Sequence, residues 1–265
     1  MGFKGISAFW LKIIAITGMT LQHTALALSG MFSLPVEIFL QISGGLTFPI
    51  LAFLLVEGFR ATSDLKKYKK RILIFAIISI VPHLMAFGSG ANIMFTLLFG
   101  LIILELRAQY GNKFVFWVFF ALLALASFLF DWGIVGVTVI LLYDIIKCEK
   151  KRRIVVPIVA AAGLLIFSVL IGLIDFSAAF GPETMEVAKA LVDEKTIAGL
   201  FFPVGSLLAI PLLLLYKGHR GLRMKWFFYV FYPVHLVILA VLSIIFGTNI
   251  LVNMFNEIFS YFYIF

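Results

Sequence analysis

The strongest constraint on this chain is a series of long apolar runs that contain no Asp, Glu, Lys or Arg. A helix needs about 20 such residues to cross a bilayer. Because 63% of the 265 residues are hydrophobic, the composition also departs from that of a soluble globular domain. The sequence predicts an all-α, polytopic integral membrane protein forming a single transmembrane domain over 1–265. The uncharged runs cover 13–36, 38–56, 72–104, 114–130, 154–174, 196–216 and 226–256.

The basic residues between these runs predict the orientation of the chain. All but two of the 21 Lys and Arg residues would lie on the side of the N-terminus if nine spans cover 10–30, 38–59, 72–87, 92–106, 114–130, 132–146, 154–174, 197–216 and 226–246. Basic loops usually stay in the cytoplasm. We therefore expect about nine transmembrane helices and a cytoplasmic N-terminus. The loop 176–195 would face outward, and the tail 249–265 would form an interfacial helix there.

The basic clusters also raise the question of what they bind. The net charge of +8 follows the loops, so it indicates topology and a bilayer partner, and no nucleic acid is predicted. The clusters either set topology alone or also hold phosphates. The densest one, KKYKKR, is the best phosphate candidate. A single cysteine, Cys148, leaves no disulfide and no multi-cysteine metal site, and no metal is predicted. The predicted phosphate ligands are Lys12, Lys66, Lys67, Lys70 and Arg71.

Two histidines lie inside long apolar spans, where ionisable residues are rare and usually functional. His23 lies in the first span, with Lys12 three turns earlier on the same face. His235 lies near mid-depth in the last span, and Tyr232 is one turn before it. Imidazole is the side chain best suited to act as a general base near neutral pH. We expect His235 to be the more important base, with His23 as the alternative and Tyr232 as the residue that orients His235.

Other polar or small residues share helix faces in the predicted spans. Each of them has a structural explanation, such as an i, i+3 ion pair or a helix cap. The functional alternative is a passage for substrate through the bilayer. The residues assigned to that passage are Gly44, Gly45, Pro49, Glu57, Arg60, His83, Asn92 and Thr96.

Five segments, in order along the chain, resemble the TraX family of conjugal-transfer membrane proteins, which is linked to N-terminal acetylation of pilin. The segment FPILAFLLVEGFRATSDLKKYKKRILIFAIIS (48–79) is the most specific. The family usually has Asp directly before the first histidine and Arg in the glycine element, where this chain has Gln22 and Gly45. The other segments are LKIIAITGMTLQHTA (11–25), NIMFTLLFGL (92–101), DWGIVGVTVIL (131–141) and FYPVHLVIL (231–239).

The resemblance implies a multi-pass acyltransferase of the bacterial inner membrane that takes an acyl group from acetyl-CoA at the cytoplasmic side. The acceptor would be an amine or a hydroxyl on a peptide, sugar or lipid that arrives from the outer side. A pilin-like N-terminus is the acceptor that the resemblance favours. Two other classes stay open: a proton-coupled transporter or flippase that uses the same histidines as a relay, and a structural subunit of a conjugation or secretion assembly.

Overall fold

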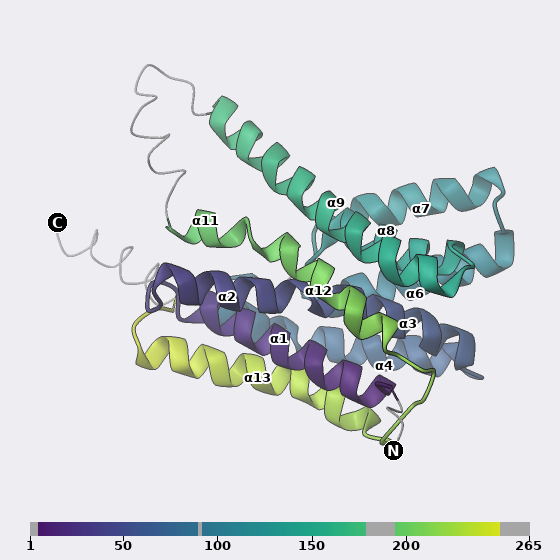
Figure 1. Ribbon diagram of the computed structural model, residues 1–265, viewed down its shortest axis with the longest axis horizontal. Helices are drawn as coiled ribbons and strands as arrows, with labels where there is room; N and C mark the ends of the chain where they lie inside the picture. The colour runs from purple at the N-terminus through teal and green to yellow at the C-terminus, as the bar shows by residue number, and fades with distance from the viewer. Residues whose placement is uncertain (1–4, 90–91, 179–193, 250–265) are drawn as a thin grey trace.

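The computed structural model describes residues 5–89, 92–178 and 194–249, and its regular elements in these ranges are helices (Figure 1). Only an isolated bridge between Ile6 and Tyr216 adds β-type pairing there. The helices are α1 (Ala8–Ala27), α2 (Leu34–Gly45), α3 (Thr47–Ala61), α4 (Leu65–Ile78), α5 (Ile80–Phe87), α6 (Ile93–Tyr110), α7 (Phe114–Ser127), α8 (Gly133–Ile145), α9 (Glu149–Ala178), α11 (Glu194–Gly199), α12 (Phe202–Leu214) and α13 (Lys225–Ile245).

Each of the nine predicted spans coincides with a helix or with a pair of consecutive helices. By length and apolarity, five of the described helical segments are able to cross a bilayer, or six if the bent pair α4–α5 is one span. The helices α7 and α8 have 14 and 13 residues, short of the ~20 that a crossing needs. The count of nine crossings and the orientation of the N-terminus therefore remain predictions. The expected interfacial tail and most of the expected outer loop lie outside the described residues.

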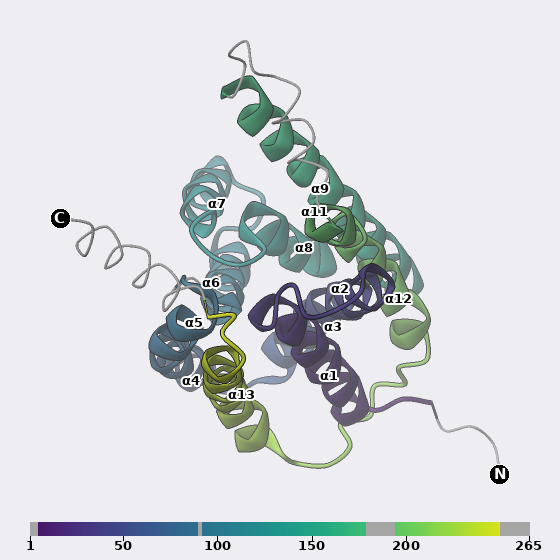
Figure 2. The same cartoon turned by 90° about the vertical axis from the view of Figure 1, so that its left-hand side faces the viewer.

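The helices pack around α3, which is buried through its middle from Ala52 to Val56. Figure 2 shows α1, α2 and α3 grouped beside α13 and α4, while α7 and α8 lie with α6, and α9 lies with α12. The core between these helices is apolar and includes Phe48, Phe53 and Leu101, each at most 1% exposed. The outward faces carry large apolar side chains, such as Phe114 at 82% exposure, as a helix surface facing lipid would.

Pro49 and Gly45 form the joint between α3, α2 and α12. Proline lacks a backbone N–H, so Pro49 leaves the carbonyl of Gly45 without its helical donor. The hydroxyl of Ser206 in α12 donates to that carbonyl at 3.1 Å. A Cβ atom at Gly45 would collide with the backbone of Phe202, and only glycine permits this close helix crossing. These two members of the predicted passage are therefore placed in a helix contact.

The helix α4 begins at Leu65, seven residues before the predicted span, because a cap starts it. The Asp64 side chain accepts a hydrogen bond from the backbone N–H of Lys67 at 2.9 Å. Lys and Arg are good helix formers, so the KKYKKR cluster extends the helix although it is charged. The chain then bends by 41° between α4 and α5. This bend brings His83 toward the interior, where only 4% of it is exposed.

Candidate functional site

The two predicted histidines meet inside the bundle. The Nδ1 atom of His23 in α1 lies 2.9 Å from the Nε2 atom of His235 in α13. The rings are nearly parallel, with centroids 5.2 Å apart. Both residues are buried, at 8% and 4% exposure. The structure thus joins two candidates from opposite ends of the chain into one hydrogen-bonded pair.

A backbone carbonyl decides which nitrogens of the pair carry protons. The Nδ1 atom of His235 lies 3.1 Å from the carbonyl oxygen of Phe231. A carbonyl only accepts hydrogen bonds, so this Nδ1 is the protonated nitrogen. In the neutral ring the Nε2 atom of His235 is then an acceptor, and His23 donates to it from Nδ1. The Nε2 atom of His23 therefore keeps a free lone pair.

His23 lines a cavity of about 330 Å³ that also contains His83 and Asp131. The Nδ1 atom of His83 donates to the carbonyl of Ser89 at 2.5 Å, and its Nε2 atom lies 3.4 Å from a carboxylate oxygen of Asp131. The ring of Phe87 packs edge-on against both His23 and His83, with centroids 5.0 Å from each. We call this space the histidine cavity.

The carboxylate of Asp131 is fixed by an unusual turn before α8. Trp132 has φ of 66°, in the left-handed region that non-glycine residues rarely adopt. Its ring stacks on Phe48 with centroids 4.5 Å apart, and the hydroxyl of Thr96 donates to the carbonyl of Asp131. The turn therefore presents Asp131 to the cavity from a well-packed support.

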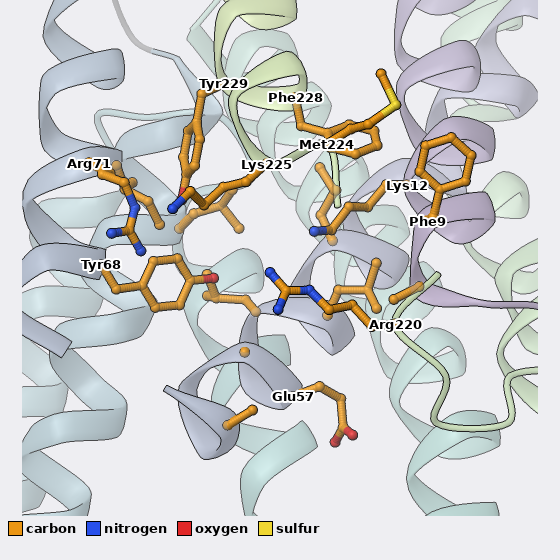
Figure 3. Close-up of a pocket in the computed structure, with 18 of the residues that line it drawn as sticks. Phe9, Lys12, Glu57, Tyr68, Arg71, Arg220, Met224, Lys225, Phe228 and Tyr229 are labelled. Atoms are coloured by element: carbon orange, nitrogen blue, oxygen red, sulfur yellow. The ribbon is translucent and has the colours of Figure 1, made fainter. Parts of the chain in front are cut away.

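A second, larger cavity of about 610 Å³ lies at the end of the bundle where α1 and α13 begin. The side chains of Lys12 and Arg220 point into this cavity, and the hydroxyl end of Tyr68 faces both of them, as Figure 3 shows. No carboxylate lies within ion-pair distance of the five cations in this wall, among the residues that the structure describes. We call this space the basic cavity. Its cations are Lys12, Arg71, Arg220, Arg223 and Lys225.

The two cavities adjoin in the middle of the bundle. Met19 and Ile93 belong to the walls of both, and His23 is one turn beyond Met19 on α1. Tyr232 lines the inner end of the basic cavity. Toward this end the wall is apolar, formed by residues such as Leu54 and Leu97. The histidine pair therefore lies next to the place where the two cavities adjoin.

The structure separates the predicted phosphate ligands into two groups. Lys12 and Arg71 line the basic cavity. Lys66, Lys67 and Lys70 are exposed and lie outside both cavity walls, and Lys67 forms an ion pair with Asp64 at 3.0 Å. Hydrogen bonds from the backbone and side chain of Lys67 hold the pKa of Asp64 below its ordinary value. The densest basic segment in sequence is thus mostly outside the cavity.

The predicted passage residues also divide. Gly44 and His83 line the histidine cavity, and Glu57 lines the basic one. Arg60 binds Asp144 at 2.9 Å. The amide of Asn92 caps α6 by accepting from the N–H of Met94 and donates to the carbonyl of Ala76. The atypical Gln22 packs against Gly44, so the two positions at which the chain departs from the family pattern lie close together.

Several cavity residues were not singled out by the sequence. Asp131 and Trp132 open the DWGIVG segment, whose resemblance to the family indicates no role for either residue. Arg220, Arg223 and Lys225 were counted only as a basic loop. Backbone hydrogen bonds hold this loop to the start of the chain, including Ala8 N–H to the carbonyl of His219 at 2.8 Å. No local sequence signal reveals that contact. Among the described residues, no group of three His, Cys, Asp or Glu side chains is placed to hold a metal.

The fold and site define a helical membrane protein with a buried histidine pair between two cavities. Comparison with known families gives a match to the model described as "TraX protein" over residues 7–243, and the chain belongs to the TraX family. It is similar to a probable fimbrial assembly protein, FimC of serogroup H1 from Dichelobacter nodosus. The two are 31% identical over 250 residues, which cover 88% of this chain and 94% of that protein. No solved structure matches the chain.

Proposed function

We propose that this protein is an integral-membrane acyltransferase that moves an acetyl group from acetyl-CoA to an amine or hydroxyl acceptor. The observation that carries the proposal is the position of the His23–His235 pair where the basic and histidine cavities adjoin. A donor with phosphates suits the first cavity, and the small reacting group of an acceptor suits the second. The pair between them is able to take up a proton, which acyl transfer requires.

The basic cavity supports the donor half of the proposal. Lys12, Arg71 and Arg220 would bind the phosphates of coenzyme A through charge-assisted hydrogen bonds. Lys12 and Arg220 are close enough to repel each other, so an anion between them would relieve an unfavourable interaction. The apolar inner wall would accept the pantetheine arm, with the thioester reaching the Met19 end.

The hydrogen-bonding pattern supports His23 as the general base, in place of the sequence-based preference for His235. The Nε2 atom of His23 has the free lone pair and lines the histidine cavity. His235 uses Nδ1 on the Phe231 carbonyl and Nε2 on His23, so neither of its nitrogens is open to an acceptor. In this reading His235 fixes the tautomer of His23 and shares the positive charge after proton uptake.

The histidine cavity supports an acceptor that arrives from the side opposite the basic residues. Among the residues that the structure describes, Asp131 contributes the one carboxylate in its wall, which suits an acceptor without negative charge next to its reacting atom. Membership of the TraX family and the similarity to a fimbrial assembly protein favour the N-terminal amine of a pilin-like subunit. The protein would act in the bacterial inner membrane, with the basic cavity open to the cytoplasm.

The test is transfer by the purified protein in lipid nanodiscs. Acetyl-CoA is supplied with a pilin-type peptide that has a free N-terminus, and thiol release and peptide mass are followed. His23→Gln should lower the rate by about 10²–10⁴-fold, the usual contribution of a general base. His235→Gln should cost less, because the Gln amide oxygen still accepts from His23. A peptide with a blocked N-terminus is the control, and absence of acetyl-CoA binding by the parent protein would refute the proposal.

A second candidate function is a structural subunit of a pilus assembly, which the description of the Dichelobacter relative favours. The two functions separate in cells that assemble pili. If a strain without the gene still forms pili, but with unmodified subunits, the protein modifies pilin and is not a building part. If that strain forms no pili and the folded His23→Gln protein restores them, assembly needs this protein in a role that does not use His23.

A further inference from the structure

Tyr232 has a buried hydroxyl that forms no hydrogen bond with any described residue. Its side chain is 4% exposed, and its hydroxyl oxygen has no partner in hydrogen-bond geometry. The sequence suggested that this hydroxyl orients His235. The two rings lie 5.4 Å apart at 58°, but the ring nitrogens of His235 are bound to His23 and Phe231. The hydroxyl therefore needs another explanation.

A buried hydroxyl without a partner is costly and uncommon. Tyr232 lines the inner end of the basic cavity, beside Met19 and Ile93, where this cavity adjoins the histidine cavity. Many of its neighbours in that wall, such as Leu97 and Ile72, are apolar. A ligand that presents a polar acceptor atom at this depth would satisfy the hydroxyl.

The first turn of α6 contributes to the same place. The first N–H groups of a helix point out of its N-terminal end, and the helix dipole is positive at this end. Asn92 caps the N–H of Met94. The backbone of Ile93 approaches the phenol oxygen of Tyr232 without reaching hydrogen-bond geometry. The positive end of the α6 dipole thus lies near the hydroxyl.

We propose that Tyr232 is a catalytic residue whose hydroxyl donates a hydrogen bond to the thioester carbonyl oxygen of the acyl donor. This inference rests on the proposed acyl transfer. The acceptor nitrogen or oxygen attacks the carbonyl carbon, its proton passes to Nε2 of His23, and the carbonyl oxygen becomes an anion held by Tyr232. When the C–S bond breaks, the sulfur leaves with the electron pair and takes the proton from His23. The products are the acetylated acceptor and free coenzyme A.

The decisive variant is Tyr232→Phe, with Tyr143→Phe as the matched control. Tyr143 is also fully buried with an unpartnered hydroxyl, but it lines neither cavity. Removing one oxyanion donor should lower kcat by about 10²–10³-fold and raise KM for acetyl-CoA by no more than about 2- to 10-fold, because the hydrogen bond is stronger to the oxyanion than to the thioester carbonyl. The melting temperature should hold or rise, since an unsatisfied buried hydroxyl is lost. Tyr143→Phe should share the effect on melting and keep the parental kcat.

The pH profile separates this role from the orientation of a histidine. A donor to the oxyanion lowers kcat equally across pH, whereas a residue that orients His235 would shift the midpoint of the profile. The proposal is supported if kcat of Tyr232→Phe is lower than that of the parent by the same factor at every pH and the midpoint of the pH profile is unchanged. A parental kcat in Tyr232→Phe, or a moved midpoint, would overturn it.

Binding of two donor analogues provides a readout without turnover. S-acetonyl-CoA keeps a carbonyl, and S-ethyl-CoA lacks one. Tyr232→Phe should weaken the binding of S-acetonyl-CoA by about 2- to 10-fold, the range of a neutral hydrogen bond, and leave the affinity for S-ethyl-CoA unchanged. If parent and variant bind each analogue equally well, the role of Tyr232 is overturned while the proposed acyl transfer still stands. If the parent binds neither analogue, the acyltransferase function and this role fail together.

Discussion

Two sets of basic residues lie at the same end of the molecule and differ in their partners. In the first set, Arg60 and Arg107 both bind Asp144, at 2.9 and 3.0 Å, and Arg152 binds Glu57 at 2.8 Å. In the second set, the cations of the basic cavity have no carboxylate within ion-pair distance among the described residues. The first set ties together α3, α6, α8 and α9.

The difference shows that position along the chain does not reveal the task of a basic residue. A paired and buried arginine stabilises the contact of helices, and removing its partner leaves an uncompensated charge. An unpaired group of cations stores unfavourable repulsion that an anionic ligand would remove. We therefore expect mutations in the first set to affect stability and mutations in the second to affect ligand affinity.

The largest expected effect is on the paired set. Asp144→Asn leaves Arg60 and Arg107 without their shared carboxylate and should lower the free energy of unfolding by about 2–3 kcal/mol. Scanning fluorimetry in detergent would show the loss as a lower Tm. Affinity for acetyl-CoA should stay at the parental value. Glu149→Gln, at a side chain 67% exposed, is the control and should change Tm little. If Asp144→Asn instead lowers the affinity for acetyl-CoA strongly and leaves Tm unchanged, the paired and unpaired sets do not differ as expected.

A smaller effect, in affinity, is expected for the unpaired set. If the basic cavity binds acetyl-CoA as proposed, Arg220→Gln removes one charge-assisted contact and should weaken binding by about tenfold, with Tm unchanged or slightly raised. Isothermal titration at constant salt measures the change. The matched control is Lys66→Gln with Lys70→Gln, which removes two exposed cations outside the cavity walls. If the control weakens binding as much as Arg220→Gln, the net charge of this face matters and the cavity does not.

The smallest effect concerns the cap of α4. Hydrogen bonds from Lys67 hold the pKa of Asp64 below its ordinary value of 3.8. A depressed pKa adds stability above the unfolded-state value, and this stability is lost as the pH falls through the folded-state value. The Tm of the parent should thus fall slightly more than that of Asp64→Asn between about pH 5 and about pH 2. Asparagine keeps the cap without titrating. If the Tm of the parent and that of Asp64→Asn fall equally with pH, the exposed Asp64–Lys67 pair contributes nothing to stability.

The apolar runs predicted where helices form because burial and lipid contact both require uncharged residues. They predicted the ends of the helices less well. The start of α4 depends on the cap at Asp64, and the joint at Leu46 depends on the Pro49–Gly45 contact with α12. Apolarity carries no information about caps or about helices that meet end to end. Apolarity also does not determine the number of membrane crossings, since α7 and α8 are shorter than a bilayer requires.

The candidate site was predictable in its residues and not in its geometry. An imidazole in an apolar span is conspicuous, and this identified His23 and His235. The rotation of two distant helices leaves no local pattern, so their contact could not be foreseen. The prediction of phosphate ligands followed density along the chain and selected Lys66, Lys67 and Lys70, whereas the basic cavity collects single cations from several segments of the chain.

The contact of His23 with His235 also sets an order of events during synthesis. The partners are 212 residues apart, in the first and the last described helix. At a translation rate of about 5–20 residues per second, His23 would wait roughly 10–40 s in the membrane before its partner is made. During that interval a polar ring has to be accommodated by lipid, water or the insertion machinery. A chain that stops before α13 would therefore contain His23 without the ring to which it is hydrogen-bonded in the complete bundle.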